Sequence, residues 1–162
     1  MPATYEAITT TTLTSAQTSV TLNSFSGYTD LVLIIYAEYT STGANPRIQY
    51  NSDASAIYSS TYLYGNNTTA GSYRLSGYSH TYLSGGAEST TVPSMMIVNL
   101  QNYANTTTFK SILVKYMGTA TQAMPSANLF RSTSAITSMV LDTQSGNWDA
   151  GSTFTLYGIK AA

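Results

Sequence analysis

Charged side chains are scarce in this chain of 162 residues: they make up 8% of it, against roughly 25% in an ordinary globular domain. The six cations stand singly along the sequence and the formal net charge is −1, so no basic surface is expected that could gather phosphates. Hydrophobic residues still make up 43%, which is enough for a core. The sequence therefore predicts a folded domain with a neutral surface and no nucleic-acid partner.

Cysteine is absent, which excludes both a disulfide framework and a thiolate metal site. The first residues have neither a basic segment nor an apolar stretch of the kind found in secretory signals. The longest apolar run, Leu31 to Ala37, is far shorter than the ~20 residues that cross a bilayer as a helix. We therefore expect no export signal and no membrane insertion.

Groups suited to catalysis are also few. His80 is the single histidine, and no nucleophile-elbow pattern surrounds it. Asp142 and Asp149 bracket a turn, but their spacing does not predict the separation that a glycosidase pair needs, and capping of the turn explains Asp149 better. The Asn51-Ser52-Asp53 segment has oxygen ligands two apart but lacks the further carboxylates of a calcium loop. No catalytic, cofactor-binding or metal-binding residue is predicted.

What the chain does have is short segments rich in β-branched and aromatic residues, separated by clusters of glycine, asparagine, serine and threonine. This pattern predicts an all-β, antiparallel sandwich of two sheets in a single domain spanning residues 1–162, with no helix. The predicted strands are Thr4 to Thr11, Ser19 to Phe25, Leu31 to Tyr39, Arg47 to Tyr50, Thr61 to Tyr64, Ser72 to Leu83, Ser94 to Leu100, Phe109 to Met117, Ile136 to Asp142 and Thr153 to Lys160.

Three segments carry more specific expectations. Leu31 to Tyr36 is apolar at every position, which predicts a central strand covered on both faces. Gly118 to Asn128 contains Pro125 and has no periodicity, so it is expected to be an irregular, mobile or partner-ordered loop. Residues 1–12 are rich in threonine and are predicted to form an N-terminal arm that is disordered until it meets a partner.

The chain has 14 tyrosines, and six of them lie among serine, threonine, glycine and asparagine in its middle third. This composition is typical of a binding surface, where tyrosine gives contact area at small entropic cost, but it also fits tyrosines that pack between strands or subunits. The six tyrosines that form this candidate receptor-binding cluster are Tyr58, Tyr62, Tyr64, Tyr73, Tyr78 and Tyr82. Trp148, at a turn, has two interpretations as well: an anchor at a subunit interface, which we favour, or a platform for a sugar.

Four segments of the chain form a recognisable pattern: Ile48 to Ser59, Tyr103 to Lys110, and the ending made of Ser134 to Leu141 and Gly146 to Lys160, which is the most specific part. These segments resemble a family of virion proteins of tailed phages and cyanophages. The resemblance covers nearly the whole chain, although Gly71 to Pro93 matches only loosely and no fibre-attachment extension is present. It implies a jelly-roll module that serves as a capsid decoration (cement) protein, often trimeric, or as a small tail or fibre head.

We therefore expect a protein of the virion surface, made in the host cytoplasm, that forms a homo-oligomer, with a trimer expected, and binds the major capsid protein or other virion proteins. The residues expected at its interfaces are Tyr5, Glu6, Trp148, Tyr157 and Ile159. The alternative is the head of a tail or capsid fibre that recognises a host surface glycan through the tyrosine cluster. A depolymerase is disfavoured because acids and histidine are so few.

Overall fold

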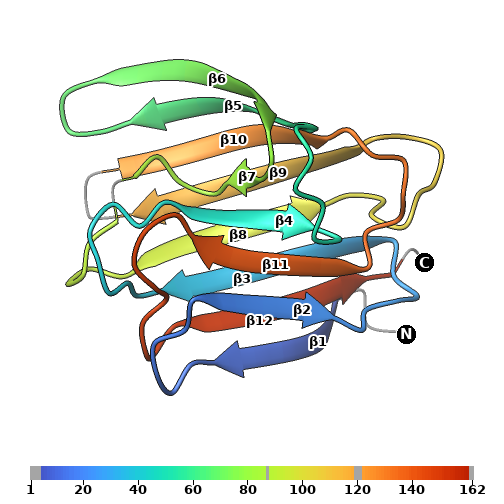
Figure 1. Cartoon of the computed structure of the whole chain (residues 1–162), viewed down its shortest axis with the longest axis horizontal. Helices are drawn as coiled ribbons and strands as arrows, with labels where there is room; N and C mark the ends of the chain where they lie inside the picture. The colour runs from blue at the N-terminus through green and yellow to red at the C-terminus, as the bar shows by residue number, and fades with distance from the viewer. Residues whose placement is uncertain (1–4, 87, 119–121, 161–162) are drawn as a thin grey trace.

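A computed structural model describes residues 5–86, 88–118 and 122–160 as two antiparallel β-sheets packed face to face (Figure 1). The described residues contain no helix, and so none that could cross a membrane. The predicted fold class is confirmed: the chain is an antiparallel β-sandwich of the jelly-roll type in a single domain.

The larger sheet has eight strands, and the chain's first and last strands lie side by side in it. In spatial order the strands are β1 (Tyr5–Thr12), β12 (Thr153–Ile159), β3 (Asp30–Ala37), β8 (Ser94–Leu100), β9 (Lys110–Gly118), β10 (Gln122–Phe130), β5 (Tyr58–Gly65) and β6 (Ala70–Tyr78). The smaller sheet lies in front of it in Figure 1 and has the order β2 (Ser19–Asn23), β11 (Ser138–Thr143), β4 (Pro46–Tyr50) and β7 (Thr81–Tyr82).

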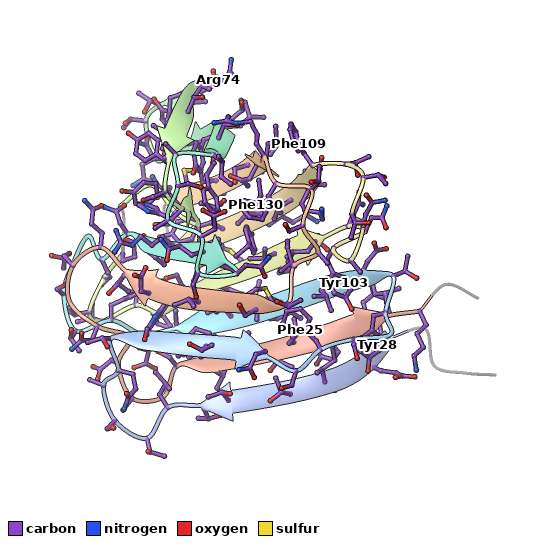
Figure 2. The ribbon with its side chains drawn as sticks, turned by 45° about the vertical axis from the view of Figure 1, so that its right-hand side comes forward. Phe25, Tyr28, Arg74, Tyr103, Phe109 and Phe130 are labelled. Carbon is purple, nitrogen blue, oxygen red and sulfur yellow. The ribbon has the colours of Figure 1, made fainter. Side chains whose placement is uncertain are left out.

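The core lies between the sheets because every second residue of each strand points inward. In β3 these residues are Leu31, Leu33 and Ile35, and all three are fully buried. They form one cluster with the inward residues of the small sheet, such as Ile48 and Leu141. At one end of the cluster the rings of Phe25 and Tyr103 meet edge to face, 5.6 Å apart (Figure 2).

The prediction of a loop over Gly118 to Asn128 is wrong for its described part, because residues 122–130 form strand β10 between β9 and β5. Pro125 has no N–H to donate, and the ladder to β5 indeed omits Met124 and Pro125, while the ladder to β9 is continuous. Residues 119–121 lie outside the described residues. A proline inside a sheet is therefore accommodated by a gap on one side only.

The prediction of a disordered N-terminal arm is wrong for residues 5–12, which form β1 and pair with β12 from Tyr5 opposite Ile159 to Thr12 opposite Thr153. Residues 1–4 lie outside the described residues. The predicted strand Ser72 to Leu83 is in fact two strands, β6 and β7, because after Tyr78 the chain crosses from the large sheet to the small one. Gly77, with a φ of +75°, is the extra residue at a register shift just before β6 ends.

Candidate functional site

The outward surface of the large sheet, opposite the side that the small sheet covers, carries large apolar side chains. The neighbouring strands β3, β8 and β9, and β5 on the far side of β10, each present at least one to solvent. The exposed members are Tyr36 (43%), Met95 (39%), Leu113 (49%), Met117 (55%) and Leu63 (58%). We call this surface, built by the outward residues of β12, β3, β8, β9, β10 and β5, the outer face.

Strand register aligns these side chains in rows across the outer face. Tyr36 lies opposite Met95, and Met95 opposite Met117; we call these three residues the Met row. In the next row Ile97 and Pro125 flank Lys115. Directly opposite side chains on one face lie about 4.5–5.5 Å apart at Cβ, so each row forms a continuous surface.

Two hollows lie on the outer face. One has a volume of about 580 Å³, and its lining includes the Met row together with Val92 and Pro93. The other, of about 360 Å³, is lined by Leu63, Leu113, Pro125 and Ala127, among others. Both linings are mainly apolar, although Asn66, Asn67 and Gln122 also line the larger hollow.

Charge is almost absent from the middle of the outer face. At the outward positions of β8, β9 and β10, Lys115 is the one charged side chain. Desolvation of this surface by a partner would therefore cost little, because no carboxylate and only one ammonium would have to leave water. The face has the chemistry of a protein–protein contact surface, which is enriched in aromatic residues and methionine and poor in lysine at its centre.

Three of the five residues predicted at interfaces border this surface or its edge, whereas Glu6, opposite Gly158, points to the other side of the sheet, toward Tyr28. Tyr157 and Ile159 point outward from β12 and are half-buried, and Tyr5 is exposed on the edge strand β1. Glu6 is bound by Lys160, with 2.9 Å between Oε2 and Nζ, and accepts a hydrogen bond from the Tyr28 hydroxyl. The hydrogen bond from Lys160 holds the pKa of Glu6 below its ordinary value.

The prediction for Trp148 is wrong, because its side chain is fully buried in the core. The indole Nε1 donates a hydrogen bond to the Leu141 carbonyl, and the ring packs against Tyr39 and Phe154. A buried indole needs one polar partner and otherwise gives apolar contact. Trp148 therefore joins the two sheets from within and presents no surface to a subunit or a sugar.

The tyrosine cluster is divided between core and surface, which corrects two of its members. Tyr58 and Tyr62 are fully buried, and their hydroxyls donate to the carbonyls of Asp53 and Tyr82. Burial raises the pKa of Tyr58 to about 12. Tyr58 and Tyr62 therefore cannot contact a receptor in this fold.

The other four tyrosines of the cluster reach the surface to different extents. Tyr73 and Tyr78 are exposed, and Tyr64 and Tyr82 are half-buried. Tyr73 stacks on Tyr62 with ring centroids 4.7 Å apart. A hollow of about 130 Å³ beside Tyr73 and Tyr82 is lined by polar residues that include Asn45 and Gln144. This is the one part of the cluster with both exposed rings and adaptable amides.

The remaining candidates are held in structural roles. Both carboxylate oxygens of Asp142 accept hydrogen bonds from Arg47, at 2.6 and 3.1 Å, and Asp149 caps its turn through the Ala150 N–H, as predicted. Asn51 Oδ1 accepts from the Thr137 N–H, and Asp53 Oδ1 accepts from the Ser55 N–H. Within residues 5–86, 88–118 and 122–160, no three histidine or acidic side chains gather as metal ligands would.

His80 is buried at the crossover between the sheets. Its Nδ1 lies 3.0 Å from the Ser79 hydroxyl, and its ring meets that of Tyr82 edge to face at 4.4 Å. Burial, with a smaller contribution from Arg47, lowers the pKa of the imidazole below 6.5. The position suits a neutral packing residue better than a general base.

Two buried charged residues were missed by sequence reasoning. Lys110 is almost fully buried, and its ammonium donates to the carbonyls of Thr108, Ser132 and Thr133. Glu88 is buried as well, and it accepts hydrogen bonds from the Asn45 N–H and the Ser84 hydroxyl. Lys110 lies two residues before the buried Ile112, so both side chains point to the same face of β9, and this spacing could have predicted that Lys110 is buried.

No protein-family model matches the chain, and no curated protein sequence does. Solved structures match the fold at low similarity. An exo-inulinase from Aspergillus awamori is 12% identical with a TM-score of 0.45, over 96% of this chain and 29% of that chain. The alginate lyase Aly36B is 10% identical with a TM-score of 0.39, over 93% of this chain and 77% of that one.

The galectin LEC-6 from Caenorhabditis elegans is 12% identical with a TM-score of 0.37, over 91% of this chain and 94% of that one. These similarities concern the sandwich fold, and they carry no argument about what this chain binds or does.

Proposed function

We propose that this chain is a structural protein of a tailed-phage virion, a capsid decoration (cement) protein that self-associates, as a trimer in the form that the sequence suggests, and binds the major capsid protein. The observation that carries the proposal is the outer face: a broad, nearly uncharged surface with five exposed large apolar side chains, which the protein's own small sheet does not cover. A monomeric soluble protein rarely exposes such a surface without a partner for it.

The neutral composition supports the same role. Hydroxyls and amides lose less on leaving water than carboxylates or ammonium groups do, so the rest of the surface also tolerates permanent contact with other subunits. Tyr157 and Ile159 extend the outer face toward the β1 edge, where Tyr5 lies, and these three residues form the proposed contact with neighbouring virion proteins, while Glu6 lies on the other side of the same edge.

Lattice stabilisation follows from mass action in this proposal. A ligand that binds only the assembled lattice stabilises it by RT ln(1 + [L]/Kd) at each site, and closed symmetry repeats that gain over all equivalent sites. No cofactor, metal or catalytic step enters the mechanism.

A second function is favoured by one observation: Tyr73 is exposed beside a small polar hollow that Tyr82, Asn45 and Gln144 also line, and the exposed Tyr78 packs edge to face on Tyr82. In this alternative the chain is the receptor-binding head of a tail or capsid fibre, and those tyrosines stack on a host surface glycan. Tyr64 and Tyr82 support the same region from half-buried positions.

The two functions differ in copy number. We expect quantitative mass spectrometry of purified virions to find hundreds of copies of this chain, in simple ratio to the major capsid protein, since icosahedral symmetry multiplies every equivalent site. A few to a few tens of copies would favour the receptor-binding head. Absence from the virion would overturn both.

A further inference from the structure

The outer face raises the question of which surface covers it. A standard protein–protein interface buries roughly 800 Å² per partner and involves about 20–30 residues a side. That area is about a tenth of the 7710 Å² that this chain exposes. The outward positions of the six strands from β12 to β5 amount to about twenty, so the face is large enough for one stable interface.

The surface of the outer face is not flat at the Met row. Met117 is the most exposed member of the row, at 55%, and the hollow of about 580 Å³ that it helps to line opens directly beside it, toward Val92 and Pro93. A protruding side chain and a hollow thus lie next to each other on one surface. A second copy would supply both features at once, with Met117 of each copy in the hollow of another.

The distribution of charge also favours a second copy of this chain as the partner of the Met row. No charged side chain lies in the Met row, and a second copy meets it with an equally uncharged surface. Lys115 stands one row away, where its flexible stem can reach solvent at the rim of the contact. A contact centred on Lys115 would set like charges against each other, so the uncharged row is the centre.

We infer that the Met row is a self-association site, in which Tyr36, Met95 and Met117 of one copy pack on the Met row and adjoining hollow of a second copy of this chain. This inference rests on the proposed structural role and names the partner of its apolar surface. Methionine is flexible and polarisable and tyrosine gives rigid contact area, so the two residue types together fill an irregular hollow well.

The test is the mass of the purified full-length chain by sedimentation velocity and light scattering over about a hundredfold range of concentration. We expect two or three times the monomer mass of 17.3 kDa. Met117→Glu should raise the dissociation constant about tenfold or more, because it buries a carboxylate in an apolar contact. Met117→Leu should retain association.

The matched control is Phe109→Gln. Phe109 is 50% exposed and has the same parity as Met117, but it precedes the other end of β9, about 27 Å away along the strand. We expect Phe109→Gln to leave the dissociation constant unchanged. Equal loss of association in Met117→Glu and Phe109→Gln would overturn the assignment to the Met row, as would a monomeric parent protein.

The two proposals fail separately. A monomeric chain that is nevertheless present in virions at hundreds of copies would overturn self-association and keep the decoration role. A chain that associates through Met117 in solution but is absent from virions would do the reverse. Circular dichroism of each variant shows whether it is folded, and Tyr36→Ser tests the same row from β3 if Met117→Glu does not fold.

Discussion

The two faces of the large sheet are built by alternate residues of the same strands, yet one is sealed and the other open. In β9 the inward residues Ile112 and Val114 are buried, whereas the outward Leu113 and Met117 are about half exposed. The two sets are similarly apolar, so hydrophobicity does not distinguish the faces. What distinguishes them is the small sheet, which covers one face and leaves the other open.

The comparison predicts that two adjacent substitutions lower the free energy of unfolding by very different amounts. Ile112→Ala should lower the free energy of unfolding by about 2–5 kcal/mol, because it leaves a cavity between the sheets. Leu113→Ala should change it by about 0.5 kcal/mol or less, because that side chain faces solvent. Chemical denaturation of both variants at a concentration where the chain is monomeric measures the difference. Equal costs would mean that the outer face is covered within the monomer.

A second prediction concerns Gly158, where the inner face of the large sheet is covered by a side chain from a loop. A Cβ added at Gly158 would overlap the ring of Tyr28, which occupies the space beside β12 (Figure 2). Gly158→Ala should therefore cost about 1–3 kcal/mol in the free energy of unfolding, measured by denaturation.

The control for this prediction is Gly65→Ala, since nothing lies within 4 Å of the added Cβ there. Combining Gly158→Ala with Tyr28→Ala should recover part of the loss if the clash is its cause. A double variant as unstable as the sum of the single ones would show that Gly158 matters for another reason.

The smallest predicted effect is a pH dependence of stability that arises at the buried crossover between the sheets and not at the open outer face. Because burial lowers the pKa of His80 below 6.5, the folded chain favours the neutral imidazole. Stability from this group is complete above about pH 6.5 and is lost as the pH falls below it, until the folded state also binds the proton. The free energy of unfolding should fall between about pH 7.5 and pH 5, and His80→Gln should show a smaller fall.

His80 is the single histidine of the chain, and the carboxylates are common to both proteins, so the difference between their pH slopes reports this residue. Arg47, Asp142 and Tyr82 lie around it and are unchanged in the variant. Identical slopes would mean that His80 is as well solvated in the folded chain as in the unfolded one.

Much of the fold could be predicted from sequence because strand chemistry is local. β-branched and aromatic runs between turn residues give the all-β class and most strands. β10 was missed because its inward residues include Ser126 and Asn128 beside Met124 and Phe130, so apolar alternation is lost, and because Pro125 argues against a strand. Which strand pairs with which depends on contacts far apart in sequence, and no local pattern encodes them.

The site was harder to predict because tyrosine and tryptophan are compatible with either side of a strand. Tyr58 and Tyr62 share a parity with the buried Ser60, but that parity has meaning only once β5 is known to face the small sheet. The continuous apolar run of Leu31 to Tyr36 did indicate a strand with two apolar faces. Its inner face is covered as predicted, while Tyr36 on its outer face remains exposed.

The pairing of β1 with β12 has a consequence for synthesis of the chain. β1 lies at the edge of the sheet and its sole strand partner in the described structure is β12, so β1 is synthesised long before the strand that it pairs with. Such non-local pairing closes late and leaves an unpaired strand at risk of aggregation on the ribosome. The threonines and Glu6 of β1 keep that waiting segment polar, so it can remain solvated until β12 emerges.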